Sequence, residues 1–199
     1  MKIEAVILDM DGTIWDGPID WLEVRSAIGL PKNGKPILAH LDELAPDERA
    51  RGFRILHSYE EHGVKNGKLM PGAQELLRFL KDRRIRCALV SNNSRRNVQR
   101  VIELHDLRFD LVISRDDGVY KPSPEPLLRA LRGLEVEARE AIAIGDAHLD
   151  LLAAHYAGID EIVLVATKEW MLPLIPDNVG FRKVADLYEA QSAIAELLT

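Results

Sequence analysis

The sequence lacks several features that define other classes of protein. It has a single cysteine, Cys87, so no disulfide can form within the chain. It has no apolar run close to the roughly 18 residues that a membrane-spanning helix needs, and its first residues show no apolar core of a signal peptide. These absences predict a reduced, cytoplasmic protein that does not bind a membrane.

The chain also has fewer basic than acidic residues. The chain has 26 lysine and arginine residues against 32 acidic ones, which gives a formal net charge of -6. An excess of negative charge argues against a broad nucleic-acid-binding face. Apolar residues make up 47% of the chain and charged residues 29%, as in ordinary globular proteins. At 199 residues the chain can bury one core and carry an insertion.

Short apolar runs alternate with helical patterns along most of the chain. The runs are continuously apolar, which is typical of strands buried on both faces. Strand-helix repetition of this kind predicts an α/β fold with a Rossmann-like parallel sheet. We expect strands at 5–9, 86–91, 111–114, 141–145, 162–166 and 181–184, and helices at 72–83, 94–105, 123–132, 149–157 and 187–198.

One segment interrupts this alternation. Residues 15–69 contain no convincing strand and instead suggest three helices, at 21–28, 37–44 and 46–61. Pro46 suits the first turn of the third helix, and Gly63 is expected to end it. The pattern therefore predicts a small all-helical domain of residues 15–69, inserted after the first strand of an α/β core formed by residues 1–14 and 70–199.

Polar motifs occur at successive strand ends and helix starts of the expected core. The carboxyl ends of parallel strands meet at one edge of the sheet, where open α/β sheets place their active sites. We therefore expect the motifs to contribute to one site. They are Asp9-Met10-Asp11-Gly12-Thr13, Ser91-Asn92-Asn93, Lys121-Pro122-Ser123-Pro124 and Gly145-Asp146-Ala147-His148-Leu149-Asp150.

These residue types are the ones that phosphoryl transfer requires. Carboxylate oxygens can hold Mg²⁺, which bridges to substrate phosphate. A hydroxyl group and backbone amides at a helix start can bind phosphate oxygens, and a lysine adds a positive point charge. One carboxylate can attack phosphorus while a second transfers the proton. The motifs together indicate a phosphoryl-transfer site.

In this order, the four motifs and the helical insertion resemble the haloacid dehalogenase superfamily of phosphohydrolases, and the resemblance covers the whole chain. It implies that Asp9 is the nucleophile that forms an aspartyl-phosphate. Asp11 would be the general acid and base, which protonates the leaving oxygen and then activates water. Ser91 with the Asn92 amide would bind phosphate, and Lys121 would steady both the nucleophile and the phosphate.

The same resemblance implies a magnesium site. Asp146 would bind Mg²⁺ directly, together with the Asp9 carboxylate and the backbone carbonyl of Asp11. Asp150 would support the metal site as the second acid of the fourth motif. Gly12 and Thr13 would support the site through the turn after the first strand.

The resemblance favours a Mg²⁺-dependent phosphatase that acts on a small phosphorylated metabolite. A phosphoglycolate-like compound or a sugar phosphate is the expected substrate, because small helical caps at this position resemble the phosphoglycolate-phosphatase-like branch. Two alternatives stay open, a β-phosphoglucomutase-like phosphomutase and a non-catalytic phosphate-binding or regulatory module of the same fold. We expect a monomer or a homodimer.

Overall fold

The computed structural model describes residues 2–198. The chain divides into two compact units. The first, here called the α/β unit, comprises Met1–Asp16 and Leu69–Thr199, and the second, the helical unit, comprises Gly17–Lys68. Across residues 2–198, no helix has both the length and the apolar character that crossing a membrane requires.

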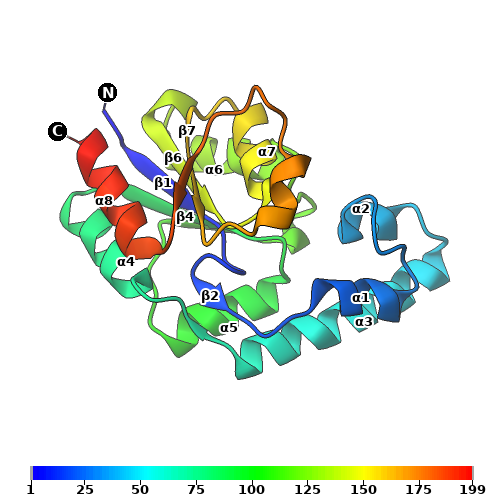
Figure 1. The fold of residues 1–199 in the computed structure, drawn as a ribbon. Helices are drawn as coiled ribbons and strands as arrows, with labels where there is room; N and C mark the ends of the chain where they lie inside the picture. Colours follow the sequence, from blue (N-terminus) through cyan, green and yellow to red (C-terminus); the bar gives the residue numbers. More distant parts are fainter. Residues whose placement is uncertain (1, 199) are drawn as a thin grey trace. The chain divides into compact units, whose positions relative to one another are not determined.

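A six-stranded parallel sheet forms the centre of the α/β unit (Figure 1). Its strand order is β5-β4-β1-β6-β7-β8, so the first strand lies in the interior of the sheet. This arrangement confirms the predicted α/β fold with a parallel core. The strands are β1 (Ala5–Leu8), β4 (Arg86–Val90), β5 (Leu111–Ile113), β6 (Ala141–Gly145), β7 (Glu161–Val165) and β8 (Arg182–Val184).

Helices pack against the sheet, and the pattern of burial explains the apolar runs. Ala5 and Ile7 of β1 belong to one buried cluster with Leu127 and Leu151 of two neighbouring helices. Successive side chains of a strand point to opposite faces, yet the intervening Val6 is also fully buried. The helices of this unit are α4 (Ala73–Asp82), α5 (Arg95–Leu104), α6 (Glu125–Leu134), α7 (His148–Tyr156) and α8 (Leu187–Leu197).

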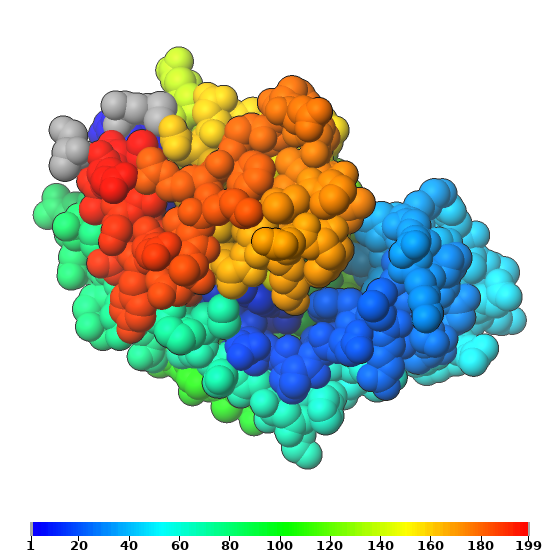
Figure 2. All heavy atoms as spheres, viewed as in Figure 1, coloured from blue at the N-terminus to red at the C-terminus, as the bar shows by residue number. Residues whose placement is uncertain are grey.

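Three short 3-10 helices complete the α/β unit. They are η1 (Arg115–Asp117), η2 (Ala138–Glu140) and η3 (Glu169–Leu174). The last of them follows β7, in the orange part of the surface in Figure 2. Met171 of η3 is buried in the core cluster, whereas Trp170 is 66% exposed. The segment therefore covers part of the core and leaves one large aromatic side chain in solvent.

The helical unit consists of α1 (Trp21–Ile28), α2 (Ile37–Asp42) and α3 (Pro46–Asn66). Asp20 caps the start of α1, because its carboxylate accepts hydrogen bonds from two backbone amides of the first turn. Gly29 ends α1 in a left-handed conformation. The segment is thus helical, as its sequence predicts.

Two details of the segment between residues 15 and 69 differ from the prediction. Gly63 does not end α3, which continues to Asn66. A Cβ atom at Gly63 would lie 2.6 Å from Ile19 Cδ1, so the glycine permits a close tertiary contact inside the helix. Two strands of two residues each, β2 (Trp15–Asp16) and β3 (Lys68–Leu69), were not expected and form a small sheet of their own.

Candidate active site

A tight turn carries Asp9 and Asp11 away from the end of β1. The carbonyl oxygen of Met10 accepts hydrogen bonds from the backbone amides of Thr13 and Trp15, at 3.2 and 2.9 Å. Met10 itself is fully buried. Because this buried residue anchors the turn, the two aspartates that flank it are held at the carboxyl edge of the sheet.

Two glycines allow aspartates to lie directly against the backbone. Gly12 has a φ angle of +86°, which favours glycine, and a Cβ atom there would overlap with the carboxylate of Asp146. A Cβ atom at Gly145 would overlap in the same way with the side chain of Asp150. Each glycine is therefore needed where a carboxylate approaches the main chain.

Lys121 lies at the centre of the acidic groups. Its Nζ is 2.5 Å from Asp9 Oδ1 and 2.5 Å from Asp150 Oδ1, and it also donates to the carbonyl oxygen of Val90 at 2.9 Å. The residue is only 3% exposed. These three acceptors fix the ammonium group, which in turn fixes one oxygen of each carboxylate.

The side chain of Asn92 holds the backbone of Lys121. Its Nδ2 donates to the Lys121 carbonyl oxygen at 2.9 Å, and its Oδ1 accepts from the Lys121 amide at 2.8 Å. The guanidinium of Arg115, a buried residue, donates to the Asn92 carbonyl oxygen at 2.9 Å. The second and third motifs are therefore joined through Asn92, by contacts that the sequence does not reveal.

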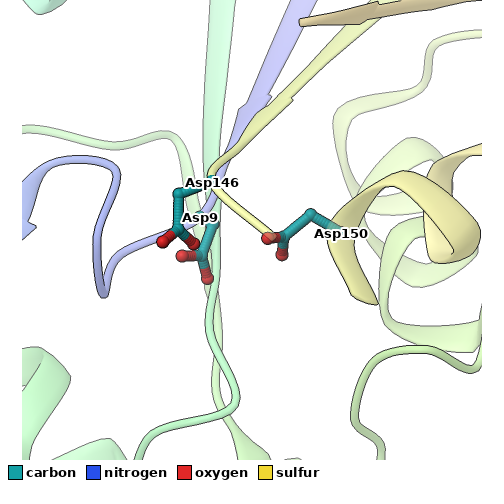
Figure 3. A group of neighbouring side chains, drawn as sticks. All are labelled: Asp9, Asp146 and Asp150. Atoms are coloured by element: carbon teal, nitrogen blue, oxygen red, sulfur yellow. The ribbon is translucent and has the colours of Figure 1, made fainter. Parts of the chain in front are cut away.

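Three carboxylates converge beside this lysine (Figure 3). Asp9 and Asp146 directly follow the adjacent strands β1 and β6, and Asp150 points toward them from the first turn of α7. One oxygen of each lies within 4.8 Å of one oxygen of the others. The structure thus brings together four of the sequence-predicted site residues, including Lys121.

Burial and mutual repulsion raise the pKa values of two of these carboxyls. Burial raises the pKa of Asp9 well above its usual range, with the neighbouring carboxylates adding to the shift and Lys121 opposing it. Burial and then the charge of Asp150 raise the pKa of Asp146 to about 7, against the opposing charges of Lys168 and Lys121. If all three carboxyls were ionised, the cluster would carry more negative charge than its lysine compensates.

The side chain of Asp11 lies outside this cluster and contacts the second motif. Asn93 Nδ2 donates to Asp11 Oδ2 at 3.0 Å. The backbone amide of Asn93 donates to Ser91 Oγ at 3.0 Å. Thr13 Oγ1 is 3.5 Å from Asp9 Oδ2, the oxygen that Lys121 does not contact. Only the folded structure reveals the role of Asn93, because its partner lies 82 residues away in the sequence.

The family assignment agrees with this geometry. The sequence pattern of the family described as haloacid dehalogenase-like hydrolase matches residues 17–164. The chain belongs to the haloacid dehalogenase-like hydrolases. The resemblance drawn from the four motifs is therefore confirmed, and the protein is an enzyme of the hydrolase class.

Individual relatives of this hydrolase agree with the assignment. A haloacid dehalogenase-like hydrolase domain-containing protein from Arabidopsis thaliana is 30% identical over 166 residues, which cover 76% of this chain and 66% of the plant protein. A protein from Halalkalibacterium halodurans named pyrophosphatase PpaX is 25% identical over 213 residues, covering 95% of this chain and 97% of the relative.

Solved structures share the fold over nearly the whole hydrolase. A HAD-superfamily hydrolase from Ehrlichia chaffeensis is 27% identical, with a TM-score of 0.69 and full coverage of both chains. A hydrolase from Pseudomonas syringae has a TM-score of 0.80 at 21% identity, covering 98% of this chain and 100% of the other. At that identity the second likeness shows the fold alone.

The donor set of this hydrolase suits a hard divalent cation. Lys121 binds one oxygen of Asp9 and one of Asp150, and the other oxygen of Asp150 accepts the Ala147 amide at 3.0 Å. The donors that remain are the carboxylate of Asp146 and the second oxygen of Asp9, whose contact with Thr13 Oγ1 is long, at 3.5 Å. Carboxylate oxygens are the ligands that Mg²⁺ prefers, and a cation here would compensate the surplus negative charge.

Proposed function

We propose that the protein is a Mg²⁺-dependent phosphatase that hydrolyses a small phosphorylated metabolite through an aspartyl-phosphate on Asp9. The observation that carries this proposal is the contact of the Lys121 ammonium with Asp9 and Asp150, at the sheet edge where Asp146 also lies. A buried lysine in this place holds one oxygen of the nucleophile and offers positive charge to an incoming phosphoryl group. Family membership supports the same chemistry.

Each residue of the site has a defined task in this mechanism. The Asp9 carboxylate attacks phosphorus, and Asp11 protonates the oxygen that leaves. Ser91 and the Asn92 amide bind phosphoryl oxygens, with Lys121 neutralising part of their charge. Water then attacks the aspartyl-phosphate while Asp11 takes its proton. Mg²⁺, when bound, would stabilise the charge that spreads over the phosphoryl oxygens.

Asp9, Asp146 and the backbone carbonyl of Asp11 are the proposed ligands of the metal. Asp150 is given a supporting role, because both of its oxygens already accept hydrogen bonds. Gly12 and Thr13 support the site through the turn, where Gly12 leaves room for the Asp146 carboxylate. We further propose that residues 15–69 act as a cap domain that selects the substrate.

Two classes of substrate are candidates. The helical insertion favours a phosphoglycolate-like compound or a sugar phosphate, as the sequence suggested. The Halalkalibacterium relative is named a pyrophosphatase, which favours inorganic pyrophosphate as the second candidate. Both classes place a phosphoryl group on an oxygen that needs a proton as it leaves, so the same site residues serve either one.

A substrate panel with a trapping experiment tests the proposal. Phosphate release is measured from phosphoglycolate, sugar phosphates, inorganic pyrophosphate and an aryl phosphate, with Mg²⁺ and with a chelator. We expect release only with Mg²⁺, and a phosphoryl group on the peptide that contains Asp9 after rapid acid quenching. Folded, Mg²⁺-supplied protein that releases phosphate from none of them would refute the proposal. Formation of glucose 6-phosphate from β-glucose 1-phosphate would indicate a mutase instead.

A further inference from the structure

The side chain of Asn93 is buried, and its amide group makes three hydrogen bonds. The residue is 2% exposed. Its Oδ1 accepts hydrogen bonds from the Ser94 backbone amide at 2.8 Å and from Asn97 Nδ2 at 2.9 Å. Its Nδ2 donates to Asp11 Oδ2 at 3.0 Å. One buried amide group thus links the start of α5 to the turn that follows β1.

These contacts leave Asn93 one orientation. An amide oxygen has two lone pairs, and here two N–H donors occupy them. Turning the amide over would set its NH2 group against the Ser94 amide, a backbone group that only donates. The backbone of Asn93 is held as well, because its amide donates to Ser91 Oγ and its carbonyl accepts from the Arg115 amide at 3.1 Å. The NH2 group must therefore face Asp11.

We infer that Asn93 is a positioning residue that holds Asp11 by Oδ2 and so selects Oδ1 as the oxygen that gives and takes the catalytic proton. A proton on Oδ2 would face the N–H donor of Asn93, whereas a proton on Oδ1 leaves that hydrogen bond intact. The inference rests on the proposed phosphatase function. It adds the particular oxygen of Asp11 that reacts and the residue that makes this choice.

The two proton transfers then pass through one atom. In the first step an Asp9 oxygen forms a bond to phosphorus, the phosphorus–oxygen bond to the leaving group breaks, and its electron pair stays on the leaving oxygen. The proton on Asp11 Oδ1 moves to that oxygen, giving an alcohol and the Asp11 carboxylate. In the second step Oδ1 takes a proton from water as the water oxygen bonds to phosphorus, and the electron pair of the broken acyl phosphate bond returns to Asp9.

A pair of aryl phosphates separates this role from a structural one. Dinitrophenolate is a stable leaving group that needs no proton, whereas phenolate from phenyl phosphate needs one. In Asn93→Ala, we expect the first turnover of 2,4-dinitrophenyl phosphate to stay within about threefold of the parent rate. Release of phenol should fall about 10- to 100-fold, because general acid catalysis and its geometry supply factors of this size. KM for phenyl phosphate should change by less than about threefold, because Asn93 touches Asp11 rather than the phosphoryl group.

Two further variants keep the test decisive. Asn97→Ala leaves Asn93 in place and removes one of the donors that orient it, so it should show the same selective loss at smaller size. Gln99→Ala removes an exposed amide from the same helix and should match the parent with both substrates. If Asn93→Ala does not fold, the comparison of Asn97→Ala with Gln99→Ala decides.

The outcomes distinguish the inference from the function on which it rests. Equal losses with both aryl phosphates, or no loss with phenyl phosphate, would overturn the positioning role of Asn93 alone. A parent protein that hydrolyses neither compound would overturn the proposed function and the inference with it. A loss confined to the substrate whose leaving group needs a proton would support both.

Discussion

Both units of the molecule bury cations, and Lys121 in one unit and Arg25 in the other have different surroundings. Lys121 in the α/β unit is 3% exposed and lies between the carboxylates of Asp9 and Asp150. Arg25 in the helical unit is 8% exposed and donates to the backbone carbonyls of Pro31 and Lys35, at 2.6 and 2.9 Å. Arg25 thus organises a loop through neutral dipoles, whereas Lys121 sits in a surplus of negative charge.

This difference separates Arg25, whose charge stabilises a loop, from Lys121, whose charge belongs to the candidate active site. The backbone carbonyls around Arg25 accept hydrogen bonds from Nε and Nη1 of its guanidinium, so neutral groups compensate part of the cost of burying the charge. In the acidic cluster of the α/β unit, burial raises the pKa values of Asp9 and Asp146, so balancing their ionised forms requires a proton or an external cation in addition to Lys121. Such an imbalance is typical of sites that bind ions or carry out proton transfer.

The largest effect is expected from Asp9→Asn. Removing the proposed nucleophile should lower kcat about 10⁴-fold or more, a loss typical of nucleophile substitutions. The folded protein should stay at least as stable at about pH 8 without metal, because its environment disfavours a charged group at this position. Steady-state kinetics and thermal denaturation measure the two quantities. A variant that kept most of its rate would rule out covalent catalysis by Asp9.

Lys121 and Arg25 should respond differently to removal. Lys121→Met strands two buried carboxylates, which should cost about 3–5 kcal/mol of unfolding free energy at about pH 8. The cost should be smaller at about pH 5, because burial raises the pKa of Asp9 and favours its protonated form there. Arg25→Met strands only carbonyls, so we expect a cost of about 1–3 kcal/mol at both pH values. Urea denaturation measures both. Equal pH dependence in the two variants would contradict the contrast drawn between them.

Two glycines with similar backbone angles offer a finer comparison. Gly12 and Gly29 have φ angles of +86° and +92°, so alanine should cost each about 1–2 kcal/mol of stability. A Cβ atom at Gly12 would also displace the Asp146 carboxylate, while one at Gly29 would meet no atom within 4 Å. We expect Gly12→Ala to lower kcat about 100-fold and Gly29→Ala to leave it unchanged. Similar kcat values for both variants would show that Asp146 does not need its place against Gly12.

The smallest expected effect concerns pH and metal. The pKa of Asp146 is raised to about 7 in the folded protein, so the native state binds more protons than the unfolded state between about pH 4 and 7. Stability of the metal-free protein should therefore fall as pH rises through this interval. Mg²⁺ binds the ionised carboxylates, so it should raise the melting temperature by about 5 °C more at about pH 8 than at about pH 5.

A matched pair of variants checks this effect. Asp146→Asn should abolish most of the Mg²⁺-dependent shift, whereas Asp160→Asn, at an exposed position between α7 and β7, should keep it. Differential scanning fluorimetry at the two pH values is sufficient. A shift of equal size in both variants would mean that Mg²⁺ binds elsewhere.

The sheet and its helices could be predicted because local sequence reflects their burial. A run such as Ala5–Leu8 is apolar at every position because both faces of β1 are covered. The end of α3 could not be predicted, because Gly63 is a helix-ending residue by local preference and is retained inside the helix by its contact with Ile19. The short strands β2 and β3 leave no pattern in two residues.

In the candidate site, too, some residues could be predicted from the sequence and some contacts could not. Asp9, Lys121, Asp146 and Asp150 could be singled out because residue type and position after a strand carry the signal. The contacts of Asn93 with Asp11 and of Arg115 with Asn92 could not be predicted, because they join residues that are 82 and 23 positions apart in the sequence. The amide of Asn93 reaches Asp11 only because folding brings the start of α5 beside the turn after β1.

The hydrogen bonds between Asn92 and the main chain of Lys121 have a consequence for protein engineering. They join residues that are 29 positions apart, so the backbone of the lysine is held by a residue from another loop. If the lysine alone were introduced into a related protein, its backbone would lack these two hydrogen bonds and its ammonium group would not be held in one position. A graft of this site should carry the asparagine and the lysine together as one inseparable part.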